Sequence, residues 1–207
     1  MPSHPVAQAL IREAGVPIAA PSANPFGYVS PTCAQHVVDG LGDRVDLVLD
    51  GGPCLLGVES TIVAMTGTWP ELLRPGSVTL AEIRNVIGPA TYTPATQNIA
   101  VPGQLPRHYA TRTPMTILAA PGARPVVQNH ERAGLLAMSQ PSHRDHQICA
   151  IEILSASGDL REAARHLFAA LRRLDERGLD RIYAEPCAES GIGLAIMDRL
   201  RRCAAPM

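Results

Sequence analysis

The chain has 207 residues, a formal net charge of −1 and an isoelectric point near 6.6, so its overall charge does not favour binding to nucleic acid or to an anionic membrane. Only 3% of its residues are aromatic whereas 46% are hydrophobic, and a mainly aliphatic core favours the α/β class. The five cysteines lack C-x-x-C spacing and no apolar stretch reaches ~20 residues, which argues against a zinc site, a disulfide framework and a membrane span and favours a cytoplasmic location.

The first part of the chain alternates between helix and strand patterns. Apolar residues at helical spacing predict helices over residues 5–14, 31–41 and 79–88. The last of these begins with a capping box formed by Thr79 and Glu82. Short apolar runs bounded by turn residues predict strands over residues 16–20, 45–52, 58–65 and 70–76.

The second part follows a stretch rich in Pro and Thr, which is expected to be an extended interdomain linker over residues 90–113. Beyond it, apolar runs predict strands over residues 115–120, 133–138, 148–154 and 180–185. Helical periodicity predicts helices over residues 159–177 and 193–204. Residues 114–207 are therefore expected to form a small parallel α/β domain, separate from a first domain over residues 1–89.

A polar turn follows the first predicted strand, in the segment Pro21-Ser22-Ala23-Asn24. Hydroxyl, amide and backbone N–H groups at the end of a strand suit an anion or a nucleotide, because open α/β sheets bind ligands there. The alternative is a turn in which Ser22 and Asn24 only satisfy their own backbone.

Three further segments carry polar groups that could meet a ligand. The strand segment Glu59-Ser60-Thr61 needs a polar partner for at least one side chain, unless that side of the strand faces solvent. Arg74, fixed by the following Pro and Gly, suits a phosphate, although a surface ion pair would explain it equally. Arg107-His108-Tyr109 could fold over a ligand, or Tyr109 could simply anchor the linker.

A basic run near the C-terminus, Arg199, Arg201 and Arg202, lies in the last predicted helix. Cations are favourable near the C-terminal end of a helix dipole, so these three side chains are expected on its solvent-exposed face. Nothing in the sequence points to a Ser-His-Asp triad.

Seven short motifs in this order resemble the YrdC-type threonylcarbamoyl-adenylate synthases in their long form. They are PIAAPSAN, SPT, LDGG, GVEST, LLRPG, RHYA and GIGLAIMDRLRR. The resemblance runs over essentially the whole chain. It implies the C-terminal part of a YrdC-like twisted-sheet α/β domain over residues 1–89, the linker 90–113, and an appended Rossmann-like parallel α/β domain over residues 114–207.

The resemblance implies a nucleotidyltransferase that joins L-threonine, bicarbonate and ATP into L-threonylcarbamoyl-AMP and releases pyrophosphate, with Mg²⁺ as an expected cofactor. Its product would pass to the machinery that modifies transfer RNA at the adenosine beside the anticodon. Such chemistry depends on orientation and charge neutralisation, so no catalytic nucleophile is expected. By position in the motifs, the implied roles are nucleotide binding for Ser22, Ser30, Arg74 and Tyr109, threonine binding for Ala20 and Ser60, and support for Asn24 and Thr61.

Members of that family carry a further segment ahead of the matching region, including a Lys-x-Arg element. The chain is therefore expected to lack the upstream half of the YrdC-like domain, to be poorly active alone, and to expose apolar faces that promote aggregation or dimerisation. The alternative function is a non-catalytic nucleotide- or RNA-binding module that kept the pocket and lost the chemistry.

Overall fold

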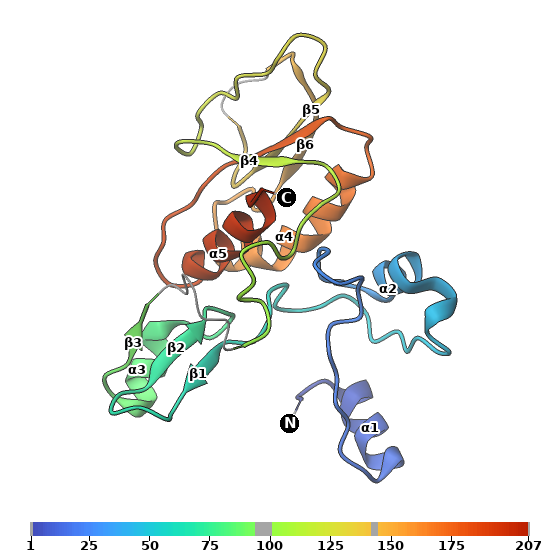
Figure 1. Cartoon of the computed structure of the whole chain (residues 1–207), viewed down its shortest axis with the longest axis vertical. Coiled ribbons are helices and arrows are strands. Elements are labelled where there is room, and N and C mark those ends of the chain that lie inside the picture. Colours follow the sequence, from blue (N-terminus) through green and yellow to red (C-terminus); the bar gives the residue numbers. More distant parts are fainter. Residues whose placement is uncertain (1, 94–100, 142–144, 207) are drawn as a thin grey trace.

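The structure, a computed structural model, describes residues 2–93, 101–141 and 145–206 (Figure 1). We call residues 2–93 the first unit and residues 101–206 the second unit. Residues 94–100 of the expected linker lie outside the described residues.

The first unit combines helices with a small sheet. Its elements are α1 (Pro5–Ala14), α2 (Ala34–Leu41), a 3₁₀ turn (Gly42–Arg44), β1 (Ile62–Ala64), β2 (Glu71–Arg74), α3 (Leu80–Ile87) and β3 (Thr91–Tyr92). In the sheet, β2 pairs antiparallel with β1 and parallel with β3. The three expected helices are confirmed, and the expected strands over 58–65 and 70–76 are confirmed in part.

Helix α3 begins as its sequence predicts. The Thr79 side chain accepts a hydrogen bond from the backbone N–H of Glu82 at 3.3 Å, and the Glu82 carboxylate accepts one from the backbone N–H of Thr79 at 2.7 Å. The capping box satisfies two N–H groups that have no partner inside the helix.

Two expected strands are wrong. Residues 16–20 and 45–52 have no strand structure, and most of their side chains are exposed. A strand forms only where a neighbour accepts its backbone hydrogen bonds, and within the described residues neither segment pairs with a strand. Their apolar composition therefore does not produce a ladder.

The second unit contains a parallel sheet with two helices. Its elements are β4 (Met115–Ile117), β5 (Ala133–Ala137), β6 (Ile148–Ile153), α4 (Leu160–Asp175), β7 (Arg181–Ala184) and α5 (Gly193–Ala204). The strand order is β4-β7-β5-β6 and each pairing is parallel. The expected parallel α/β organisation is confirmed, with α4 ending two residues before the predicted boundary.

Both helices of the second unit cover the same face of its sheet. Leu167 and Leu171 of α4 and Ile196 of α5 join one core cluster with Leu136 and Ile182 of the sheet. The opposite face, with Leu135 and Tyr183, packs against the loop that contains Ala123 and Val127. A Rossmann-like sheet has helices on both faces, so that finer expectation is not confirmed.

The described end of the linker is packed into the protein, which corrects the expectation of an extended connector. Tyr109 is 1% exposed, and its ring stacks on Phe168 of α4 at 5.4 Å between centroids. Ala110 forms a parallel bridge with Tyr28 and donates a backbone hydrogen bond to Gly27 at 2.8 Å. This segment thus joins the first unit to the core of the second.

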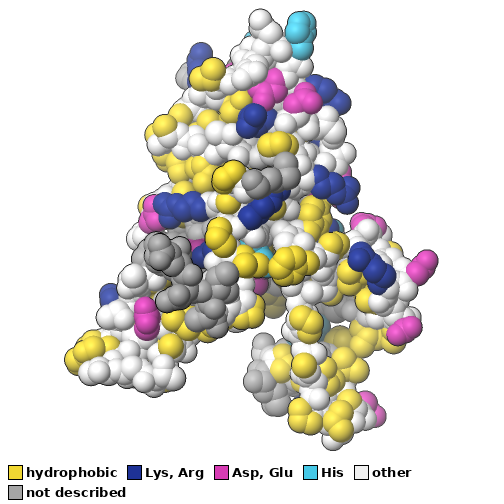
Figure 2. Space-filling model, in the orientation of Figure 1, with side chains coloured by type: hydrophobic (Ala, Val, Ile, Leu, Met, Phe, Trp, Pro, Cys, Tyr) yellow, Lys and Arg dark blue, Asp and Glu magenta, His cyan; other side chains and the backbone are white. Residues whose placement is uncertain are grey.

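Large exposed apolar side chains belong mostly to the first unit (Figure 2). Examples are Leu47, Leu55, Trp69 and Val86 in the first unit. No helix in the described residues combines the length and the apolar character needed to cross a membrane.

Candidate functional site

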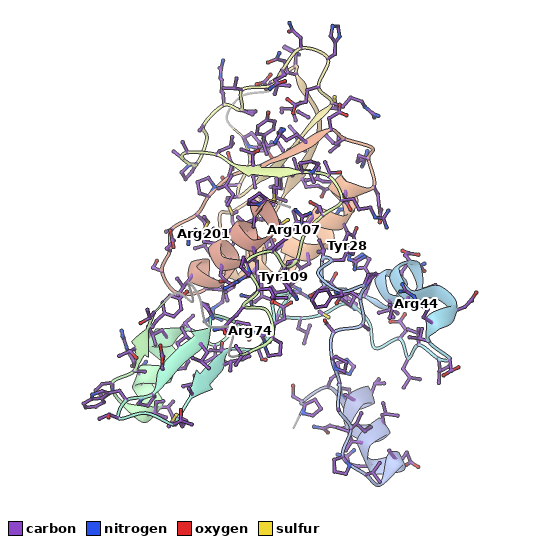
Figure 3. All side chains as sticks on the ribbon, viewed as in Figure 1. Tyr28, Arg44, Arg74, Arg107, Tyr109 and Arg201 are labelled. Atoms are coloured by element: carbon purple, nitrogen blue, oxygen red, sulfur yellow. The ribbon has the colours of Figure 1, made fainter. Side chains whose placement is uncertain are left out.

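Arg74, at the end of β2, lies where the two units meet (Figure 3). Its side chain donates from Nε and Nη2 to the carbonyl oxygen of Ser60 at 3.1 and 2.9 Å, and from Nη2 to the Ser60 hydroxyl at 3.2 Å. Nη1 donates to the carbonyl oxygen of Pro102 at 3.0 Å. The guanidinium is 8% exposed and has carbonyl partners, so the surface ion pair considered for Arg74 is wrong.

Glu59, the residue before Ser60, connects two side chains from distant parts of the chain. One carboxylate oxygen accepts a hydrogen bond from the Ser30 hydroxyl at 2.7 Å. The other accepts from Nε of Arg199 at 2.8 Å. The segment therefore has the polar partners that its sequence predicted, and Glu59 is the residue that links it to both Ser30 and Arg199.

Arg199 corrects a prediction, because its side chain is fully buried rather than solvated. It shares a helical stripe with Ala195, Ile196 and Cys203, all buried. Residues three and four positions apart lie on the same face of a helix, so this spacing in the sequence indicates that Arg199 lies on the buried face of α5. Arg201 is exposed as expected, whereas Arg202 is partly buried and donates to the carbonyl oxygen of Leu105 at 2.7 Å.

Tyr109 closes the same group of residues from the linker. The guanidinium carbon of Arg199 lies 5.0 Å from the centre of its ring. A Cβ atom on Gly103 would lie 2.3 Å from the Tyr109 hydroxyl and 3.3 Å from Nη1 of Arg74, so both side chains reach this glycine. Burial raises the pKa of Tyr109, which keeps its hydroxyl protonated and able to donate.

We call these residues the Glu59 cluster. Its members are Ser30, Glu59, Ser60, Arg74, Tyr109 and Arg199. Four were predicted as site residues, while Glu59 was noted only as one of three polar residues and Arg199 was expected in solvent. The cluster holds the guanidinium groups of Arg74 and Arg199 and the carboxylate of Glu59, and the adjacent Asp198 carboxylate also pairs with Arg199, so two cations stand against two anions.

The remaining predicted site residues do not join the cluster. Ala20 and Ser22 lie exposed in a segment without regular structure, and in the described part of the chain no side-chain hydrogen bond links either to the cluster. Thr61 pairs with Val78, whose N–H donates to the Thr61 hydroxyl at 3.1 Å. The expected convergence of Ser22 with Ser60 and Arg74 is therefore not seen in these contacts.

Asn24 behaves as the turn alternative describes. Its side-chain NH₂ donates to the carbonyl oxygens of Pro25 and Tyr28 at 2.9 and 3.1 Å. Its Oδ1 atom is buried and has no hydrogen-bond partner among the residues that the structure describes. Nδ1 of His108 is likewise buried without a hydrogen-bond partner among the described residues. Burial lowers the pKa of the His108 ring, which favours its neutral form.

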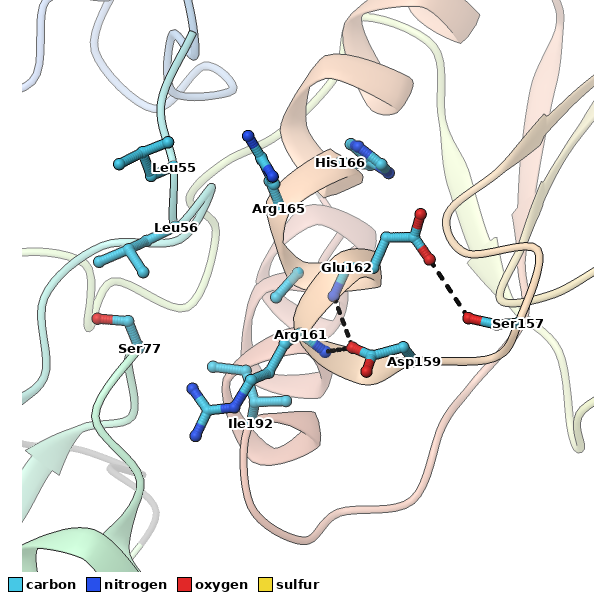
Figure 4. A pocket seen from close by; sticks show the side chains of 11 residues that line it. Leu55, Leu56, Ser77, Ser157, Asp159, Arg161, Glu162, Arg165, His166 and Ile192 are labelled. Atoms are coloured by element: carbon cyan, nitrogen blue, oxygen red, sulfur yellow. Dashed lines mark hydrogen bonds between the residues drawn. The ribbon is translucent and has the colours of Figure 1, made fainter.

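A cavity of about 570 Å³ opens between the loop of Leu55 and Leu56 and helix α4 (Figure 4). Asp159 caps the helix beside it by accepting from the backbone N–H groups of Arg161 and Glu162 at 2.7 and 2.9 Å. None of the predicted site residues lines this cavity. We therefore assign the candidate site to the Glu59 cluster and not to this cavity.

The described residues contain no group of three or more His, Cys, Asp or Glu side chains arranged to hold a metal ion. Within the cluster, both oxygens of the Glu59 carboxylate are already engaged by Ser30 and Arg199. The cluster therefore lacks a free carboxylate for Mg²⁺, which prefers oxygen ligands.

Two family models match this chain. Residues 78–205 match the family described as "Threonylcarbamoyl-AMP synthase, C-terminal domain", and residues 1–76 match the family described as "Telomere recombination". The first match contains Tyr109 and Arg199, and the second contains Ser30, Ser60 and Arg74.

Among curated proteins, the chain is 38% identical to the threonylcarbamoyl-AMP synthase of Bacillus subtilis, in an alignment that covers 99% of this chain and 62% of that protein. It is also 38% identical to the threonylcarbamoyl-AMP synthase of Pyrococcus abyssi, over 98% of this chain and 62% of that protein. The chain thus spans less than two thirds of the length of these relatives. The matches do not establish the expected truncation.

Among solved structures, the crystal structure of P. abyssi Sua5 complexed with L-threonine matches with a TM-score of 0.86 and 34% identity, covering 99% of this chain and 62% of that one. A variant of the same protein, with an adjacent His and Tyr replaced by Ala, matches with a TM-score of 0.83 and 31% identity over 99% of this chain and 61% of that one. The C-terminal-domain family model covers more than half of this chain, including α4, α5 and Arg199. This chain therefore belongs to the family of threonylcarbamoyl-AMP synthases that carry that domain.

Proposed function

We propose that this chain acts in the synthesis of L-threonylcarbamoyl-AMP from L-threonine, bicarbonate and ATP, with release of pyrophosphate, for the threonylcarbamoyl modification of transfer RNA. The observation that carries the proposal is the convergence of Ser30, Ser60, Arg74 and Tyr109, from four separate segments, in one cluster. The solved relative in complex with L-threonine supports the choice of amino acid substrate.

The cluster suits adenylate chemistry. Forming an acyl-adenylate requires a carboxylate-type oxygen to approach the α-phosphate while negative charge develops on the departing pyrophosphate. An arginine offers a planar fork of N–H donors that matches phosphate oxygens, and Arg74 would exchange its bonds to the Ser60 carbonyl oxygen for such a contact when the nucleotide binds. The Ser60 hydroxyl can donate a hydrogen bond to a ligand, and the Ser30 oxygen can accept one while its proton stays on Glu59.

We assign the nucleotide to Ser22, Ser30, Arg74 and Tyr109, and the threonine to Ala20 and Ser60, with Asn24 and Thr61 in support. Ala20 and Ser22 would have to approach the cluster when substrate binds, since their segment is exposed. Mg²⁺ would arrive on the phosphates of ATP, where it neutralises charge, because the cluster offers it no free carboxylate.

Pyrophosphate release that depends on both L-threonine and bicarbonate tests this proposal, with the 207-residue chain as enzyme. Arg74→Lys keeps the charge and loses the fork, so we expect the rate to fall about tenfold or more, as for other bonds to charged groups. Arg84→Lys is a matched control, because Arg84 also donates from Nε and Nη2 to one carbonyl oxygen, that of Ala90, outside the cluster.

Four outcomes decide between the proposal and its alternatives. Substrate-dependent release that Arg74→Lys lowers and Arg84→Lys spares supports the proposal. Adenylate binding without release favours a non-catalytic nucleotide module, and transfer RNA binding without adenylate binding favours the RNA-binding alternative. Equal losses in both variants would mean that Arg74 only holds the fold.

A further inference from the structure

A fully buried arginine from the last helix is inserted between the two units. The side chain of Arg199 has no exposed surface, although it carries a charge at every physiological pH. A buried charge is costly unless it is paired and hydrogen-bonded, so the contacts of Arg199 must be made in a defined geometry.

Those contacts use all three guanidinium nitrogens. Nε donates to the Glu59 carboxylate at 2.8 Å, Nη1 donates to the Asp198 carboxylate at 2.6 Å, and Nη2 donates to the carbonyl oxygen of Pro75 at 3.0 Å. The face of the guanidinium lies against the ring of Tyr109 at 5.0 Å. One side chain thus contacts the residue before Ser60, the residue after Arg74 and, through Tyr109, the linker.

Burial is the largest single influence on Arg199 and lowers its pKa, but Glu59, Tyr109 and Asp198 together more than offset it, and the pKa of Arg199 is raised. The same carboxylate accepts the Ser30 hydroxyl through its second oxygen. Loss of the guanidinium would therefore free Glu59 to rotate, and the orientation of the Ser30 hydroxyl would no longer be fixed.

We infer that Arg199 is a positioning residue for the adenylate site, an inference that rests on the proposed function. Arg199 holds the Glu59 carboxylate, and Glu59 in turn holds the Ser30 hydroxyl, at a fixed place relative to the Tyr109 ring. The C-terminal unit is then a working part of the site, because α5 supplies the group that arranges it. Helix α4 adds to this arrangement, since Nη2 of Arg172 donates to the carbonyl oxygen of Val29 at 2.6 Å, next to Ser30.

The variant Arg199→Lys tests the inference. It keeps the positive charge and can still reach one acceptor, but it cannot pair with Glu59 and Pro75 together or present a planar face to Tyr109. Arg199→Met removes the charge with a similar volume. Arg201→Lys is the matched control on the same helix, because Arg201 pairs with Glu189 at the exposed surface.

Three measurements on the full chain are needed: calorimetric affinity for AMP, thermal unfolding, and backbone hydrogen exchange. For Arg199→Lys we expect AMP affinity to fall about tenfold or more. Exchange should rise in residues 27–31, 57–61 and 101–113 but not in β5 and β7. Arg199→Met should weaken AMP binding and lower the unfolding temperature more than Arg199→Lys, because it leaves the carboxylates of Glu59 and Asp198 without their cation. Arg201→Lys should change neither AMP affinity nor the unfolding temperature.

Unchanged AMP affinity and exchange in Arg199→Lys would overturn the inference, and so would a rise in exchange that is uniform over both sheets, because that marks a purely structural residue. Absence of AMP binding by the unsubstituted chain would refute the proposed function instead. In that event the exchange pattern alone still decides whether Arg199 arranges Glu59 and Tyr109.

Discussion

The Tyr28 hydroxyl donates a hydrogen bond of 2.7 Å to the carboxylate of Asp175, which lies 147 residues later in the chain. The second oxygen of Asp175 accepts from the backbone N–H of Thr113 at 2.8 Å. The guanidinium of Arg172 lies 4.9 Å from the centre of the Tyr28 ring. Together these contacts tie the polar segment of the first unit to the end of α4.

The substitution Tyr28→Phe should destabilise the protein by about 1–3 kcal/mol, since it leaves one oxygen of a nearly buried carboxylate without its partner. Urea unfolding followed by circular dichroism measures this change. The double variant with Asp175→Ala isolates the interaction, because Ala offers no acceptor to the Tyr28 hydroxyl, and additive effects of the two substitutions would mean that the bond contributes nothing.

The capping box of α3 should make stability depend on acid pH. The Thr79 hydroxyl, the Thr79 backbone and Arg161 lower the pKa of Glu82 to about 2 from 4.5. The folded state therefore favours the ionised carboxylate, and this stabilisation is complete well above pH 4.5 and is lost as the pH falls toward 2. Glu82→Gln should flatten the decline of the unfolding temperature between pH 5 and pH 2.

Two outcomes check that interpretation. Thr79→Ala should cost about 1 kcal/mol at neutral pH through loss of the cap. A decline with pH that is as steep in Glu82→Gln as in the unsubstituted chain would show that other carboxylates account for it.

Gly103→Ala should disrupt the candidate site more than the fold. Gly103 has a φ of +83°, and its new Cβ would lie 2.3 Å from the Tyr109 hydroxyl, which must then move away. We expect AMP affinity to fall by at least tenfold, measured by calorimetry. Gly122→Ala is the control, because Gly122 has a φ of +71° with open space around the added Cβ, so it introduces backbone strain alone.

If both glycine variants bind AMP equally, the approach of Tyr109 and Arg74 to Gly103 has no bearing on the ligand. Equal losses of affinity and of unfolding temperature in both would point to strain as the common cause.

Exposed apolar side chains of the first unit should promote self-association, which sedimentation velocity would reveal as a sedimentation coefficient that rises with concentration. Phe26→Ser should reduce association, because Phe26 is 88% exposed in the first unit. Val126→Ser should not, although Val126 is 87% exposed, because it lies in the second unit away from that surface. A coefficient that is independent of concentration would contradict this expectation.

The fluorescence of Trp69, the single tryptophan of the chain, provides a second readout of the same association. Trp69 is exposed between β1 and β2. Its emission should shift to shorter wavelength where association covers it.

Local patterns in the sequence were enough to predict every helix and the four strands of the second unit. Helix periodicity, the capping box at Thr79 and the cap at Asp159 act within a few residues, so the chain needs no distant partner to specify them. The sequence also identified four residues of the candidate site, Ser30, Ser60, Arg74 and Tyr109, although each of these residue types has structural uses as well.

Contacts between distant segments were decided only by the tertiary structure. Residues 16–20 and 45–52 have the composition of strands, but a strand depends on a neighbour that the pattern does not specify. Arg199 lies in a basic run near the end of a helix, where a solvent-exposed side chain is expected. Its burial is possible because Glu59 and Tyr109, both far away in sequence, contact its guanidinium. Local sequence patterns identified the side chains that can bind an anion. The packing of α5 against the first unit fixed which of these side chains meet, because a buried charge such as that of Arg199 needs partners from distant segments.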